Sequence, residues 1–146
     1  MVIGCGNPLM GNDGVGLRVI EELEKTRPDI NTCEGGVGGL GLIPMMDDQE
    51  IVIIVDAMSG YADRKGEICV FTTPPENEIF PLSLSDIGVL DTVGVAEELG
   101  IAAQVIIIGI EAGHIDHFSD VMDPDVEKAV PDVVKKIEEL IDNPQP

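Results

Sequence analysis

The sequence predicts an α/β fold: a three-layer α/β/α sandwich around a mostly parallel, twisted sheet of about five strands, with one antiparallel edge strand. Short apolar runs alternate with amphipathic segments along the chain, which is the pattern of α/β proteins. Two runs, 51–55 and 104–110, are apolar at almost every position, as in strands that a parallel sheet buries on both faces. The length of 146 residues favours one domain, which we place at residues 1–142 before a frayed tail at 143–146.

The first predicted helix shows clear helical periodicity. It follows a buried strand at 1–6 and a turn-rich loop, and it runs from Asp13 to the Arg27-Pro28 pair, which ends it. Four apolar side chains share one face of this helix: Val15, Val19, Ile20 and Leu23. The opposite face is charged, so the helix should pack one side against the sheet.

The middle of the chain contains two strands of different kinds. Residues 30–34 predict a short strand, and a glycine-rich loop and a short helix at 40–46 follow it. The run 51–55 predicts a central strand that ends at Asp56. The connection to the next predicted strand, at 67–71, is too short for a crossover helix, so this strand should pair antiparallel at an edge of the sheet.

The last third of the chain continues the alternation. Residues 72–85 are proline-rich and irregular, a helix is predicted at 89–99, and a doubly buried strand at 104–110. A final helix should begin after Asp123, a suitable N-cap, with Pro124 as its first residue.

Composition excludes several classes of function. The formal net charge is −20, so a nucleic-acid or anionic-membrane partner is disfavoured, and cations or basic peptides are favoured. Solubility alone is an equally good reason for the excess of acids. The cysteines Cys5, Cys33 and Cys69 form no CxxC motif, and we expect buried free thiols in a reducing cytoplasm. We see no signal peptide and no apolar run of transmembrane length.

Acidic residues gather where the predicted parallel strands end. Ligands of open α/β sheets bind outside the carboxyl ends of the strands. Asp13, Glu34, Asp56 and Glu111 each follow such a strand or its loop, so the sequence predicts a cation site at this edge.

Two of these acids have alternative interpretations. Asp13 lies at the start of a helix, where backbone amides favour an ionised, metal-binding carboxylate, but it is equally placed to act as a plain N-cap. Asp56 follows five aliphatic residues, and a buried carboxylate there needs a metal, a hydrogen bond or a charged partner. It could therefore be functional or could cap a neighbouring helix or turn.

Other motifs point to less. Gly4-Cys5-Gly6 begins like a dinucleotide-binding loop, but Leu9 stands where the third glycine is needed, and no phosphate-loop, GxSxG or HExxH motif is present. His114 and His117 are three residues apart and would share a helix face, so they could bind a metal or lie exposed in a loop.

Five segments, in order and spacing, resemble the NiFe-hydrogenase maturation proteases. Residues 6–16 are similar to the GNxLxxDDGxG opening of that family, and residues 34–39 to its DGGTxG loop. Residues 55–57 look like its strand-ending VDA motif, and residues 109–111 with Met122-Asp123-Pro124 like its last strand and helix start.

The resemblance implies an α/β sandwich and an aspartyl-type endopeptidase that activates an enzyme. Members remove a C-terminal extension from the hydrogenase large-subunit precursor after nickel insertion, and nickel supplied by the precursor is the recognition signal. Carried over by position, Asp13 and Asp56 are the catalytic, metal-contacting carboxylates. The implied substrate-binding positions are Asn7, Glu34, Gly36, Gly38 and Ser85. The acidity and the Gly4–Asn7 opening suggest an archaeal, coenzyme-reducing type.

The sequence departs from the family pattern at two positions. Asn12 replaces the first Asp of the DD pair, and Ser85 replaces the metal-contacting His. Asp86, His114 and His117 are the candidates for a third metal contact. Loss of the His motivates an alternative function, a non-catalytic nickel-sensing or chaperone-like partner of the precursor, and an unrelated hydrolase on the same fold is a third. We expect a cytoplasmic monomer.

Overall fold

The computed structural model describes residues 1–72 and 88–144, and its five strands form one sheet in the order β2-β1-β3-β5-β4. The strands are β1 (Val2–Cys5), β2 (Thr32–Gly36), β3 (Ile51–Met58), β4 (Ile68–Phe71) and β5 (Gln104–Glu111). Neighbours among β2, β1, β3 and β5 pair in parallel, and β4 pairs antiparallel with β5 at the edge. The predicted fold class and the antiparallel edge strand are therefore confirmed.

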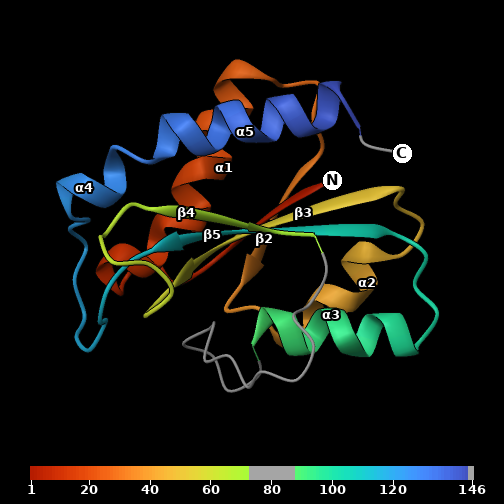
Figure 1. Ribbon diagram of the computed structural model, residues 1–146, viewed down its shortest axis with the longest axis horizontal. Coiled ribbons are helices and arrows are strands. Elements are labelled where there is room, and N and C mark those ends of the chain that lie inside the picture. Colours follow the sequence, from red (N-terminus) through yellow and green to blue (C-terminus); the bar gives the residue numbers. More distant parts are fainter. Residues whose placement is uncertain (73–87, 145–146) are drawn as a thin grey trace.

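Helices cover both faces of the sheet (Figure 1). One layer holds α1 (Val15–Thr26), α4 (Pro124–Glu127) and α5 (Val130–Asp142), and the other holds α2 (Ile43–Met46) and α3 (Val89–Glu98). The 3₁₀ turns are η1 (Gly11–Gly14) and η2 (Gly39–Leu42). Each face of the sheet has its own aliphatic core, and the predicted face of α1 is buried in the first of them.

The central strand is longer than the sequence predicts. Asp56 does not end β3, which continues to Met58, and Asp56 pairs with Gly109 of β5. The prediction was wrong because the length of a strand depends on the neighbour that pairs with it, not only on its own apolar run. Asp56 is therefore held on a regular strand rather than in a loop.

The predicted final helix is two helices. Asp123 and Pro124 occupy the expected N-cap and first position, but α4 ends at Glu127 and α5 begins at Val130. Pro131 lies in the first turn of α5, where its missing N–H is tolerated, whereas in the middle of one continuous helix it would remove a hydrogen bond.

Two glycines bring the start of α1 close to the sheet. At Gly16, a Cβ atom would lie 2.3 Å from the carbonyl oxygen of Cys5 and 2.6 Å from that of Val55. At Gly6, φ is +133° and a Cβ would lie 1.8 Å from the carbonyl oxygen of Asp13. Only glycine permits this approach, which places η1 and its Asp13 over the ends of the central strands.

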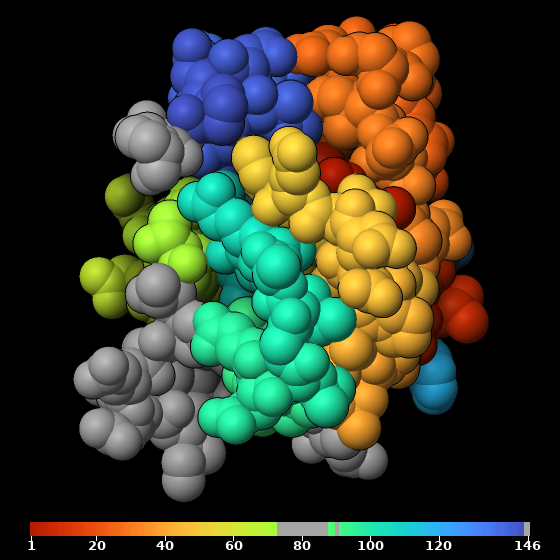
Figure 2. All heavy atoms as spheres, turned by 90° about the vertical axis from the view of Figure 1, so that its right-hand side faces the viewer, coloured from red at the N-terminus to blue at the C-terminus, as the bar shows by residue number. Residues whose placement is uncertain are grey.

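The two ends of the sheet are lined differently. The carboxyl ends of β1, β3 and β5 point toward η1 and the loop between β5 and α4. Figure 2 views the opposite end, where the loop before β3 and the end of α3 lie. Within the described ranges, no helix has the length and hydropathy that crossing a bilayer requires.

Candidate functional site

Asp13 and Asp56 lie at the carboxyl edge of the sheet, as the sequence predicts. Asp13 belongs to η1, which contacts β3, and Asp56 belongs to β3 itself. The two residues are 9% and 8% exposed, so both carboxyl groups are largely withdrawn from water. The negative charge of Asp13 is one cause of the raised pKa of Asp56.

The carboxyl group of Asp13 is not a helix cap. Its Oδ2 accepts a hydrogen bond from the backbone N–H of Asn7 at 2.9 Å, and the N-cap of α1 is Gly14, without a side-chain bond. Burial raises the pKa of Asp13 despite that hydrogen bond. Desolvation thus outweighs the hydrogen bond from Asn7 in setting the pKa of Asp13, and the metal-binding role of this residue stays a prediction.

The carboxyl group of Asp56 is the most strongly perturbed acid of the site. Its only hydrogen bond within the described part of the chain comes from the N–H of Ala57 to Oδ1, at 2.9 Å. Burial and the neighbouring charge of Asp13 raise the pKa of Asp56 from 3.8 to about 8. No cation of the described chain is paired with it, so near neutral pH this position holds a proton or needs a bound cation.

The donor set fits a divalent cation. Within the described residues, one oxygen of each carboxyl group, Asp13 Oδ1 and Asp56 Oδ2, accepts no hydrogen bond. A cation between the two groups would offset their repulsion and favour both ionised forms. Residues 1–72 and 88–144 contain no group of three potential metal ligands, so this part of the chain offers a pair of carboxylates only.

Cys5 is a neighbour of the pair that the sequence analysis did not place in the site. It is fully buried at the end of β1, and burial, together with the charges of Asp56 and Asp13, raises the pKa of its thiol. The thiol therefore stays protonated in the metal-free protein and serves as a small apolar side chain near the carboxylates. Cys33 and Cys69 are only half-buried because they lie on the edge strands β2 and β4.

Of the predicted substrate-binding residues, Asn7 contacts the carboxylate pair, and Glu34, Gly36 and Gly38 lie on or directly after the neighbouring strand β2. Asn7 holds Asp13 through its backbone, and its side-chain Oδ1 accepts a hydrogen bond from Leu9 N at 2.9 Å. Glu34 and Gly36 are exposed on β2, and the carbonyl of Gly36 accepts a hydrogen bond from Gly6 N at 2.6 Å. Gly38 has a φ of +84° in the loop that follows. The end of edge strand β2, from which the glycine loop continues, therefore lies beside the loop that carries Asp13.

The two histidine candidates for a third metal contact lie on the surface and pair with another acid. His114 and His117 are exposed and lie beside Asp116, with ring nitrogens 3.6 Å and 2.7 Å from its carboxylate oxygens. Neither histidine acts on the pKa of Asp13 or Asp56. Ser85 and Asp86 lie outside the described residues.

Glu111 is an acid of this edge with a structural role. Its buried carboxylate accepts hydrogen bonds from four backbone N–H groups, those of Gly60, Tyr61, Ala62 and Gly113. Burial alone would raise the pKa of Glu111, but these donors outweigh it and the pKa lies below its ordinary value. Glu111 therefore fixes the loop after β3 and is not available to a ligand.

Asn12 joins the loops around the site. Its Nδ2 donates to the carbonyl of Ala112 at 3.0 Å and to Asp123 Oδ2 at 3.1 Å, and its Oδ1 accepts from Asp123 N at 2.8 Å. Lys65 Nζ donates to the same Asp123 oxygen at 2.8 Å. The carboxamide is used as both donor and acceptor, which a carboxylate cannot match. The departure at position 12 is thus explained by contacts far apart in the sequence.

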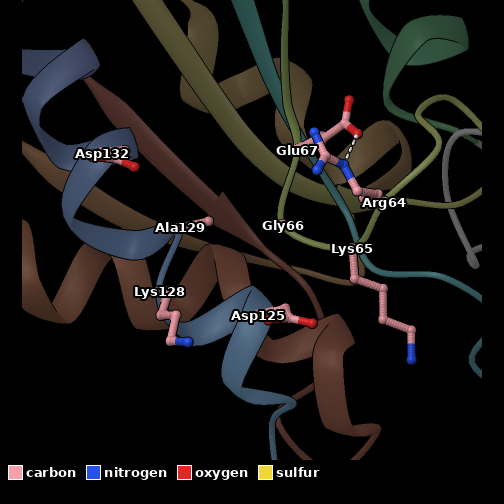
Figure 3. Close-up of a pocket in the computed structure, with 8 residues that line it drawn as sticks. All are labelled: Arg64, Lys65, Gly66, Glu67, Asp125, Lys128, Ala129 and Asp132. Carbon is pink, nitrogen blue, oxygen red and sulfur yellow. Dashed lines mark hydrogen bonds and ion pairs between the residues drawn. The ribbon is translucent and has the colours of Figure 1, made fainter.

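A hollow of about 480 Å³ lies between the loop after β3 and α4, and none of its lining residues is a predicted site residue. Figure 3 shows that Arg64 is paired with Glu67 and that the ammonium groups of Lys65 and Lys128 do not converge. Acidic side chains, Asp125 and Asp132, line the same hollow. Its charges are mixed, so it does not form a binding site for an anion.

Comparison with known proteins places the chain among relatives of one family and one fold. The hydrogenase expression/formation protein HupD of Rhodobacter capsulatus is 24% identical over 133 residues, which cover 86% of this chain and 63% of HupD. Two further curated relatives are covered over 40% and 54% of their lengths, so the chain spans less than two thirds of these relatives.

Two solved structures share the fold. The hydrogenase maturating endopeptidase HybD of Escherichia coli superposes with a TM-score of 0.79 at 23% identity, covering 98% of this chain and 92% of HybD. The NiFe-hydrogenase maturation protease HybD of Thermococcus kodakarensis gives 0.76 at 25% identity, covering 95% and 96%. The family model described as hydrogenase maturation protease matches residues 17–140, which include β3 with Asp56 and extend into the last helix, α5. This chain therefore belongs to the hydrogenase maturation protease family.

Proposed function

We propose that this protein is an endopeptidase that removes the C-terminal extension of a nickel-loaded NiFe-hydrogenase large-subunit precursor. The observation that carries the proposal is the buried pair Asp13 and Asp56, two acids whose pKa values are both raised and which no cation of the described chain neutralises. Such a pair is poised to accept a cation that a partner brings. Membership of the maturation protease family supports the same substrate.

The chemistry of the donors favours nickel that arrives with the precursor. Two carboxylates are weak ligands for nickel, which prefers nitrogen and sulfur donors, so this pair alone should retain the free ion poorly. A nickel ion that the precursor already coordinates needs only its remaining ligands from the protease. On this proposal the nickel is part of the substrate, and Asp13 and Asp56 recognise the loaded precursor by binding its nickel.

The residues of this chain would then position the bond to be cut. A divalent cation polarises a carbonyl group and activates water. Asp13 and Asp56 fix the metal end of the precursor, and backbone groups of Gly36 and Gly38 hold the extended tail beside it. The buried side chain of Cys5 is apolar, so it keeps bulk water away from the carboxylates and strengthens their electrostatic effect.

Mass spectrometry of the precursor, incubated with this protein with and without nickel, tests the proposal. We expect loss of a C-terminal peptide only from the nickel-loaded precursor. Asp13→Asn and Asp56→Asn should each abolish cleavage without unfolding the protein. Asp48→Asn is the matched control, because Asp48 is exposed before β3, has a φ of +61° that Asn tolerates, and lies far from the pair.

The outcomes separate the candidate functions. Normal cleavage by both Asp→Asn variants would refute the assignment of the pair. Binding of the nickel-loaded precursor without any cleavage by the native protein would instead support the nickel-sensing partner that Ser85 motivates. Cleavage that does not depend on nickel would refute the role of the ion.

We also propose that the protein works in the cytoplasm as a monomer. The three free cysteines, one of them fully buried, suit a reducing compartment. Size-exclusion chromatography with light scattering measures the oligomeric state, and a stable dimer would contradict this part of the proposal.

A further inference from the structure

An exposed apolar patch lies beside the loop that carries Asp13. Phe118 is 80% exposed, Val121 is 69% exposed and Leu9 is 61% exposed. They belong to two loops, one between β1 and η1 and the other between β5 and α4. In a chain with only 3% aromatic residues, an almost fully exposed Phe is costly unless something covers it. We call these three residues the Phe118 patch.

The two loops of the Phe118 patch are joined by backbone hydrogen bonds. Ser119 N donates to the carbonyl of Leu9 at 2.8 Å, and Gly11 N donates to the carbonyl of Ser119 at 2.7 Å. Ser119 also accepts at Oγ from Val121 N, at 3.1 Å. The apolar side chains are thus displayed on a fixed backbone, so a partner would lose little by ordering them.

The surroundings of the patch indicate the chemistry of its partner. A cavity of about 250 Å³ adjoins it, lined by apolar atoms of Met10, Ile115 and Val121 among polar groups. Asp120 is exposed and makes no ion pair within the described residues, and the whole chain carries a net charge of −20. A segment with apolar side chains flanked by Lys or Arg complements this surface in both shape and charge.

The patch is continuous with the candidate active site. Leu9 and Asp13 lie on the same short segment, and Asn7 contacts both through its backbone N–H and its side-chain oxygen. Whatever docks on Phe118 therefore lies next to the substrate of Asp13 and Asp56.

We propose that the Phe118 patch is a docking surface for the body of the hydrogenase large-subunit precursor, binding an apolar, basic-flanked segment outside the tail that is removed. This inference rests on the proposed function and adds a second recognition element to it. The carboxylate pair binds the nickel of the precursor, and the Phe118 patch binds the polypeptide around it. Phe118 is a docking residue, not a catalytic one.

Steady-state cleavage of the nickel-loaded precursor by Phe118→Ala tests the inference. We expect KM to rise at least about tenfold, as for an aromatic residue at the centre of an interface, with kcat within about twofold of the native value. The matched control is Leu99→Ala, because Leu99 is 65% exposed and directly follows α3. This end of α3 lies at the end of the sheet away from the Phe118 patch (Figure 1). This control should leave both constants unchanged.

Direct binding distinguishes failure of the docking surface from failure of the proposed function. Immobilised precursor should bind Phe118→Ala at least about tenfold more weakly than the native protein, whether or not cleavage occurs. Binding of the native protein should weaken with added NaCl, and Asp120→Asn should reduce this salt dependence.

Three results would overturn the inference. The first is an unchanged KM and Kd for Phe118→Ala while the native protein cleaves the precursor. The second is a fall in kcat alone, which would place Phe118 in the chemistry. The third is a dimer of the native protein that Phe118→Ala dissociates without affecting the precursor, since the patch would then bind a second copy of this chain.

Discussion

The protonation of Asp56 should make the metal-free protein less stable as the pH rises. The unfolded chain releases the proton of this residue near pH 4, whereas the folded protein retains it up to about pH 8. Between these values the folded state binds more protons than the unfolded state, so the free energy of unfolding decreases with increasing pH. Above about pH 8 both states are ionised and this contribution stops changing. Asp13, whose pKa is also raised, acts in the same direction.

The size of the effect follows from the burial of the carboxyl group. A shift from 3.8 to about 8 corresponds to about 6 kcal/mol at roughly 1.36 kcal/mol per pKa unit. Entry of water and small movements at the edge of the sheet reduce the cost of the ionised form. We therefore expect Asp56→Asn to be more stable than the native protein by about 2–6 kcal/mol at about pH 9, and by much less at about pH 5.

Urea unfolding followed by far-ultraviolet circular dichroism measures this difference. The chain has no Trp and one Tyr, so the backbone signal is the suitable probe. A chelator keeps the samples free of metal, and the comparison of the two proteins at each pH cancels the titration of the acids that do not interact with Asp56. Asp48→Asn should show no such change with pH. A difference between Asp56→Asn and the native protein that stays constant within about 0.5 kcal/mol from pH 5 to pH 9 would refute the burial argument.

Three further substitutions test the framework of the site. Gly16→Ala should lower the free energy of unfolding by about 3 kcal/mol, because its Cβ would meet two backbone carbonyl oxygens. Thermal unfolding measures this change, and an unchanged Tm would show that α1 can move away at little cost. Glu111→Gln should lower the free energy of unfolding in urea by about 3 kcal/mol, since an amide group cannot accept four N–H bonds. The control is Glu97→Gln, at an exposed position. An equal loss of stability in the two variants would contradict the role of Glu111. Asn12→Asp, which restores the family's acid, should lower the free energy of unfolding by about 1–3 kcal/mol at pH 7 through repulsion from Asp123. The stability should recover near pH 4, where the new acid is protonated. A loss of stability that does not depend on pH would argue against the hydrogen-bonded network.

The order of elements follows directly from local sequence patterns. The runs 51–55 and 104–110 are apolar on both faces, and only a strand between two helical layers satisfies that pattern. The short connection before β4 forces antiparallel pairing, and the spacing of Val15, Val19, Ile20 and Leu23 defines the buried face of α1.

The boundaries of elements depend on their partners and were less predictable. β3 continues through Asp56 because β5 offers hydrogen bonds along its whole length. The second strand is Thr32–Gly36 rather than 30–34, since its register is determined by β1. Local residue preferences carry no information about either neighbour.

The sequence alone predicted the architecture and the position of two acids, Asp13 and Asp56, at the carboxyl edge of the sheet, where the structure has them. Only the tertiary structure decided the electrostatic state of each acid. Asp56 is desolvated beside a second carboxyl group, whereas Glu111, at the end of the next strand, is surrounded by four N–H donors. The physical reason is that the pKa of a buried acid depends on which charges, donors and apolar groups the fold places around it, and these come from segments far apart in the chain.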